Sequence, residues 1–126
     1  MKKIHTLLIL LVGVVVLSAW TYRLDSPSVF RGGEANSMLE EFAVYGLNKT
    51  TMTLVGIAKV LLSIVLLIGL KFRKLVTPAA LGIALFMIAA VYFHLSVGDA
   101  LLPTLPSALM LISCLTILYI HKKVFV

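Results

Sequence analysis

This chain has little of what a soluble active site requires. Its 126 residues include one cysteine, three histidines and five acidic residues, and only 13% are charged. The lone cysteine, Cys114, cannot form an intrachain disulfide or a Cys-x-x-Cys relay. No Ser-His-Asp order, buried carboxylate pair or metal-ligand cluster is present, so the sequence gives no support for hydrolysis or a dedicated metal site. We expect no resident cofactor and no catalysis by this chain alone.

Apolar residues are plentiful instead. They make up 61% of the chain and give a mean hydropathy of +1.12, whereas soluble domains are about 45–50% apolar. Four runs stand out: residues 4–20, 51–70, 76–97 and 101–120. Each is long enough, at about 1.5 Å per residue, to cross a hydrocarbon core about 30 Å thick. The sequence predicts one all-α domain over residues 1–126, a four-helix transmembrane bundle in a lipid bilayer.

The first run is predicted to be a retained span. Lys2 and Lys3 precede it as in a signal peptide, but Leu17 stands where a cleavage site wants a small residue. Trp20 and Tyr22 are typical of aromatic anchors at a membrane surface.

The basic residues favour one orientation. The net charge is +6, which could suggest nucleic-acid binding, but the position of the charge argues against such a partner. The loops between spans one and two and between spans three and four hold all five acids. They hold only three basic residues, Arg23, Arg31 and Lys49. Seven lie at the two termini and the middle connection: Lys2, Lys3, Lys71, Arg73, Lys74, Lys122 and Lys123. This positive-inside pattern predicts that both termini are cytoplasmic.

Local signals predict several helix ends. In the outer loop of residues 21–50, Ser37 and Glu40 match a capping box, which predicts a short amphipathic helix over residues 38–45 that stops at Gly46. Thr77-Pro78 predicts the start of the third long helix and Gly98 its end. Two prolines, Pro103 and Pro106, predict an irregular start to the fourth span, with regular helix from residue 105 or 106.

Lys59 is the strongest pointer to a functional site. It lies about eight residues, or roughly 12 Å, below the outer end of its span. Inserting a lysine near the centre of a membrane span costs about 2.5–3.5 kcal/mol, so such residues usually face the protein interior and have partners there. A small and polar stripe shares its predicted face: Thr53, Gly56, Lys59 and Ser63. The alternative is that Lys59 extends toward the interface and has no function.

Four further residues could complete a polar site. His94, one turn before the outer end of its span, can exchange a proton or orient a ligand. Asp99 follows Gly98 and could serve as the counter-ion of Lys59 or His94, or as a solvated acid or helix cap. Glu40 and Glu41 could take the counter-ion role if the loop helix folds over the bundle. The sequence leaves the choice among these acids open.

Two segments resemble the DoxX-like family of small four-helix bacterial membrane proteins. One runs from Thr53 through Gly56 to Lys59, and the other reads His94-Leu-Ser-Val-Gly98-Asp99 with Pro103 following. The resemblance covers roughly residues 45–123. It implies a bacterial, hence inner-membrane, bundle and places five residues on the family's polar positions: Gly56, Lys59, His94, Gly98 and Asp99. The acid that often precedes a Trp-Ala-Tyr-Ala-Gly run in the third helix is missing here.

These features suggest three functions. In the first, an accessory or binding subunit holds a lipophilic ligand such as a quinone or lipid in an outward-facing polar pocket. In the second, the polar residues fix helix packing, and the protein acts in the assembly of a larger membrane complex through a partner subunit. In the third, it is the membrane subunit of a quinone-linked redox complex whose cofactor a partner supplies, as wider relatives of the family suggest.

Overall fold

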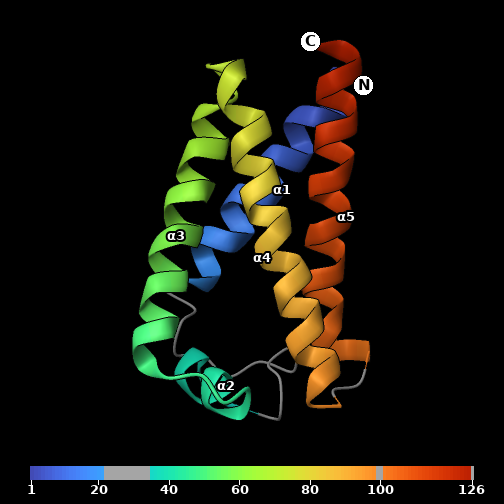
Figure 1. Ribbon diagram of the computed structural model, residues 1–126. Helices are drawn as coiled ribbons and strands as arrows, with labels where there is room; N and C mark the ends of the chain where they lie inside the picture. The colour runs from blue at the N-terminus through green and yellow to red at the C-terminus, as the bar shows by residue number, and fades with distance from the viewer. Residues whose placement is uncertain (22–34, 99–100, 126) are drawn as a thin grey trace.

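A computed structural model describes residues 1–21, 35–98 and 101–125 of the chain, with the side chains of residues 101–103 left out. This part is helical and contains no strand (Figure 1). It forms four long helices, one short helix and one 3-10 turn: α1 (Lys2–Ala19), α2 (Met38–Val44), α3 (Lys49–Ile68), η2 (Arg73–Leu75), α4 (Val76–Ser96) and α5 (Leu101–Val124).

The four long helices are long and apolar enough to span a membrane. They coincide with the four predicted runs, so the all-α prediction is confirmed. Large apolar side chains remain exposed along every one of them, for example Leu7, Leu54, Leu85 and Ile112. A continuous apolar exterior would be unfavourable in water, and lipid is the environment that accepts it.

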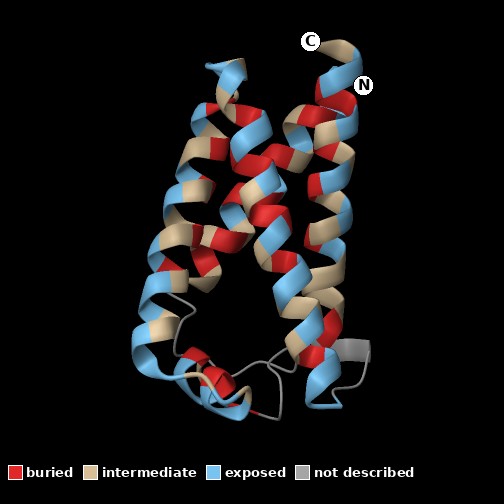
Figure 2. Cartoon of the chain, in the orientation of Figure 1, coloured by how far each residue is buried: buried red, intermediate tan, exposed pale blue. Residues whose placement is uncertain are grey.

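The long helices pack in a closed ring. α1 packs on α3 and α5, and α4 packs on the same two helices, with the α4–α5 interface the largest. The buried residues lie on the faces that these helices turn toward one another (Figure 2). The core includes Ile9, Leu66, Ile83 and Ile117, together with Cys114, which is fully buried like any small apolar residue. A single core therefore joins all four spans.

The two ends of the bundle differ. Both chain termini lie at one end, beside the α3–α4 connection, and α2 lies across the other end (Figure 1). We call these the terminal end and the α2 end.

The predicted loop helix is confirmed with its capping box. The hydroxyl of Ser37 accepts a hydrogen bond from the Glu40 amide at 3.2 Å. The Glu40 carboxylate in turn accepts one from the Asn36 amide at 2.9 Å. α2 ends one residue before the predicted limit, and Gly46 follows with φ +78°, a conformation that glycine adopts without strain. The Ser37 contact satisfies an amide that a helix start otherwise leaves unpaired, and the Asn36 contact fixes the residue before the cap.

Two predicted helix starts are wrong. α4 begins at Val76, directly after η2, and Leu75 rather than Thr77 precedes it without a side-chain cap. Val76 is fully buried, so its packing extends the helix by two residues toward η2. Pro78 is then the third helical residue, where no amide hydrogen bond is needed. The predicted end is confirmed, because Gly98 follows α4 with φ +73°.

The second wrong start belongs to α5. Its helix begins at Leu101 rather than near residue 105. Pro103 lies in the first turn, where the missing amide costs nothing, and Pro106 lies inside the helix. Pro106 removes one backbone hydrogen bond, but the extensive packing of α5 on α4 keeps the remaining ladder in place.

Candidate functional site

Lys59 lies in the middle of α3 and turns into the bundle. Its side chain is 9% exposed, so it does not extend into the acyl chains. Gly56 and Ser63 are buried on the same face, and the Ser63 hydroxyl donates a 2.8 Å hydrogen bond to the Lys59 carbonyl. Thr53, the fourth member of the predicted stripe, is exposed. Three of the four predicted positions thus form a buried polar face of α3.

Two aromatic rings surround the Lys59 ammonium. Its nitrogen lies 5.1 Å from the ring centre of Trp20 in the α1–α2 connection and 5.7 Å from that of Phe86 in α4. Both distances are typical of cation–π contacts, which stabilise a desolvated cation by about 2 kcal/mol. Within the described part of the chain, the ammonium makes no hydrogen bond and no ion pair within 4 Å. Of the two acids that the structure describes, Glu41 interacts with it electrostatically without a direct contact.

Gly56 allows Trp20 to reach this position. A Cβ atom at Gly56 would lie 2.6 Å from the Cε3 atom of the Trp20 indole, closer than two carbon atoms can approach. The indole also packs edge-on against Phe42 of α2, with ring centres 5.6 Å apart. Trp20 therefore joins α2 and α3 at the end of α1. The sequence indicated Trp20 only as a surface anchor, since nothing local shows which way an interfacial indole turns.

A second polar cluster docks α2 on α4. The Tyr45 hydroxyl donates to the Glu41 carboxylate at 3.0 Å and lies 3.2 Å from the Nδ1 atom of His94. The Nε2 atom of His94 lies 3.8 Å from the same carboxylate oxygen. Glu41 is 9% and His94 is 4% exposed, so the cluster is removed from solvent. The structure thus joins two predicted residues through Tyr45, which the sequence analysis did not select.

The other predicted site residues take different positions. Glu40 is exposed and its carboxylate serves the capping of α2, so it faces away from Lys59. Asp99 lies outside the described residues. Of the acids weighed for this site, Glu41 is therefore the one that the structure places in a buried polar cluster.

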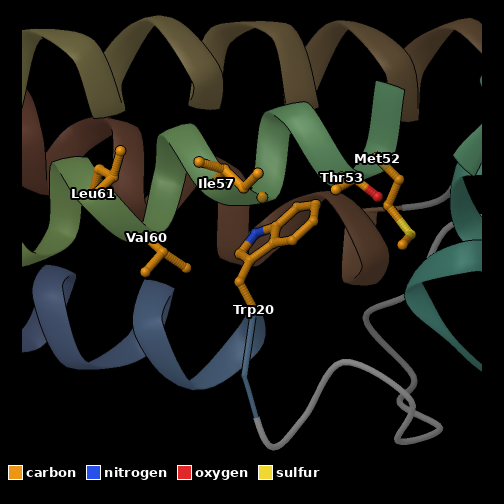
Figure 3. A pocket seen from close by; sticks show the side chains of 7 residues that line it. Trp20, Met52, Thr53, Ile57, Val60 and Leu61 are labelled. Atoms are coloured by element: carbon orange, nitrogen blue, oxygen red, sulfur yellow. The ribbon is translucent and has the colours of Figure 1, made fainter. Parts of the chain in front are cut away.

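An apolar pocket of about 330 Å³ opens between Trp20 and α3. Figure 3 shows the Trp20 indole lying against α3 beside Ile57, with Val60 and Leu61 further along the helix. The pocket is lined by Trp20, Met52, Thr53, Gly56, Ile57, Val60 and Leu61. The indole that contacts the Lys59 ammonium is thus also a wall of the pocket.

The sequence model of the DoxX-like family matches residues 6–116. The chain belongs to the DoxX-like family. The match extends the resemblance seen over residues 45–123 to include nearly all of α1. Comparison with curated proteins and with solved structures gives no match. Family membership and the four apolar helices together identify an integral protein of a lipid bilayer.

Proposed function

We propose that this DoxX-like protein is a non-enzymatic accessory or binding subunit that holds a lipophilic molecule with a polar head, such as a quinone or lipid, at its α2 end. The observation that carries the proposal is the state of Lys59. Its ammonium is buried against two rings, and no described side chain accepts a hydrogen bond from it. A buried ammonium that finds no acceptor among the described side chains is costly, and a ligand oxygen would relieve that cost.

The surrounding residues have distinct roles in this proposal. Lys59 donates to a carbonyl or acidic oxygen of the ligand head, while His94 orients the head or exchanges a proton with it. Gly56 keeps the Trp20 indole against α3, and the apolar pocket takes part of the ligand tail. Apolar walls with a few converging polar groups are typical of small-molecule sites.

Trp20 gives the experiment a local reporter, because it is the only tryptophan in the chain. Titration of the detergent-purified protein with a short-chain benzoquinone should quench its fluorescence in a saturable way. Lys59→Met should raise the dissociation constant at least about tenfold, the loss of one charge-assisted hydrogen bond. Lys49→Met, an exposed lysine at the start of the same helix, should change it less than about twofold.

Two results would count against the proposal. One is equal quenching of the wild type and the Lys59→Met variant. The other is unchanged retention of co-purified lipid or quinone, measured by mass spectrometry, in both Lys59→Met and His94→Ala.

The same proposal places the protein in a bacterial cytoplasmic membrane with both termini in the cytoplasm. The supporting observation is the charge at the terminal end, where seven basic side chains gather: Lys2, Lys3, Lys71, Arg73, Lys74, Lys122 and Lys123. Both described acids, Glu40 and Glu41, lie in α2 at the opposite end. Basic residues of short loops are enriched on the cytoplasmic side.

A second candidate function is assembly of a larger membrane complex. The contacts among Glu41, Tyr45 and His94 favour it, since they fix α2 on α4 as a structural network would. This function requires a stoichiometric partner subunit that co-purifies with the protein. A Lys59→Met variant that keeps its partner but loses quinone binding would separate the two functions.

A further inference from the structure

Another buried polar cluster lies at the terminal end, at the opposite end of the bundle from α2. His5 of α1 and His121 of α5 meet there, with the Nε2 atom of His5 3.3 Å from the Nδ1 atom of His121. Their rings are stacked, with centres 5.4 Å apart and an angle of 18° between planes. His5 is fully buried and His121 is 3% exposed. Two titratable groups from the first and last spans therefore share one site.

The ring of Phe125, just beyond the end of α5, connects this pair to the basic residues around it. Its centre lies 4.6 Å from that of His5 and 5.5 Å from that of His121. The guanidinium carbon of Arg73 in η2 lies 4.0 Å from the same centre, and the Lys2 nitrogen lies 5.9 Å from it. The cluster of His5, His121, Arg73 and Phe125 thus joins the start of α1, the α3–α4 connection and the end of α5. We call it the terminal cluster.

Two polar atoms of the terminal cluster are buried and have no hydrogen-bond partner among the residues that the structure describes. They are the Nδ1 atom of His5 and the Nη1 atom of Arg73. An unpaired buried donor is unfavourable, and native proteins rarely leave one unless a water or an ion fills the place. Arg73 Nη1 is always a donor. His5 Nδ1 is also a donor when His121 Nδ1 donates to His5 Nε2, so both of these atoms, each beside the Phe125 ring, call for an acceptor.

The charge around the cluster selects the kind of acceptor. Arg73 and Lys2 bring positive charge to the same ring, and the acids that the structure describes lie in α2 at the other end of the bundle. A metal cation would be repelled by this positive charge and would have only the two imidazoles of His5 and His121 as described ligands. No group of three or more ligating side chains occurs among the residues that the structure describes. An anion, by contrast, gains from the charges of Arg73 and Lys2 and from the His5 Nδ1 donor.

The depth of the terminal cluster in the bilayer indicates which class of anion it can meet. The terminal cluster lies where the membrane-spanning helices end, which is the depth of lipid headgroups. We propose that the terminal cluster binds a phosphate group, supplied by an anionic lipid headgroup or by free phosphate. Arg73 and His5 donate to its oxygens, and the ring of Phe125 covers the site and moves aside when the phosphate enters.

The test uses the full-length protein in detergent, with native mass spectrometry as the readout. Phosphatidylglycerol is the probe, and diacylglycerol, which lacks the phosphate, is the lipid control. The wild type should retain one phosphatidylglycerol and no diacylglycerol. Arg73→Gln should weaken this binding at least about tenfold, while Lys71→Gln, an exposed charge in the same connection, should change it less than about twofold. Phe125→Ala, which removes the cover, should retain the lipid at least as well as the wild type.

Competition identifies the source of the phosphate. Displacement of phosphatidylglycerol by millimolar inorganic phosphate assigns the site to the phosphate group itself, whereas resistance to it assigns the site to a lipid headgroup. Equal weakening by Arg73→Gln and Lys71→Gln would overturn the proposal, because a diffuse basic surface would then explain binding. No weakening by Arg73→Gln would overturn it as well.

Arg73→Lys provides a second variant in case Arg73→Gln does not fold. It keeps the charge but loses the planar fork of donors. Its affinity for phosphatidylglycerol should therefore be lower than that of the wild type and of Lys71→Gln, but higher than that of Arg73→Gln. Unchanged binding by Arg73→Lys with diacylglycerol retained equally well would reject a phosphate site. Quinone quenching of Trp20 at the α2 end should be unaffected by these variants, so the two proposals fail separately.

Discussion

The Lys59 ammonium lies 5.1 Å from the ring centre of Trp20, although the two residues are separated by an entire loop and half a membrane span. This contact explains how a cation is tolerated inside an apolar bundle. The indole and the ring of Phe86 replace part of the solvation that the ammonium loses, and none of the described side chains accepts a hydrogen bond from it. The same indole lines the apolar pocket, so Trp20 contacts both the Lys59 ammonium and the pocket.

Gly56→Ala should disturb this contact more than a matched substitution elsewhere. The new methyl group would meet the rigid Trp20 indole at 2.6 Å, and overpacking of this kind costs about 1–3 kcal/mol. Gly82→Ala is the control, since its methyl group would meet only the flexible end of Leu62 at 2.9 Å. Thermal unfolding in detergent and the Trp20 emission spectrum should change in Gly56→Ala alone. Equal destabilisation by both would show that the indole is not held against α3.

Tyr45→Phe should loosen α2 from α4. The variant loses the hydroxyl that bonds to Glu41 and lies beside His94, but it keeps the ring stacked on Phe93. Loss of buried hydrogen bonds should lower the free energy of unfolding by about 1–3 kcal/mol and speed hydrogen exchange in α2. Tyr92→Phe, on an exposed ring of the same helix α4, should change neither measurement. Unchanged exchange in Tyr45→Phe would mean that the hydroxyl does not hold α2 in place.

Single-cysteine labelling should establish the orientation. The natural Cys114 is fully buried and can be replaced by alanine, so that Lys3→Cys reports on the terminal end and Asn48→Cys on the α2 end. A membrane-impermeant maleimide should label Asn48→Cys in intact cells, and Lys3→Cys only after permeabilisation. Both should react in detergent. The reverse labelling order would invert the proposed topology.

Pro106→Ala should stabilise the protein, whereas Pro103→Ala should not. Pro106 lies inside α5 and removes one hydrogen bond from the ladder, a defect that costs up to about 3 kcal/mol in a helix interior. Pro103 lies in the first turn, where the amide has no helical partner. Unfolding in detergent should therefore occur at a higher temperature for Pro106→Ala only. A lower unfolding temperature would indicate that Pro106 is needed for packing against α4.

Patterns within single segments predicted most of the fold. Runs of apolar residues define the four spans because the bilayer thickness sets the length of a helix. The capping box at Ser37 and the positive φ of Gly46 and Gly98 depend on a few consecutive residues, so they too were predictable. The starts of α4 and α5 were not, because a proline in a first turn fits several positions and packing chooses among them.

The candidate site was predictable only in part. A lysine inside a span and a histidine near the end of another are conspicuous, and both are buried at the α2 end. Tyr45 and Trp20 looked like ordinary interfacial aromatics, since their roles depend on residues 49 and 39 positions away, His94 and Lys59. The His5–His121 pair was missed for the same reason. The one feature of the sequence that could have indicated this pair is that both termini of a four-span chain lie on the same side of the membrane.

The amino-acid sequence by itself determined that this chain lives in a bilayer, how many times it can cross, and which polar residues must be shielded. Those properties follow from transfer energies and helix geometry, which act on each segment alone. Only the tertiary structure decided which groups shield them: the rings of Trp20 and Phe86 for Lys59, and Tyr45 for Glu41 and His94. Those choices depend on how helices distant in sequence rotate and pack against one another, where differences of a few kcal/mol between neighbours select the partner.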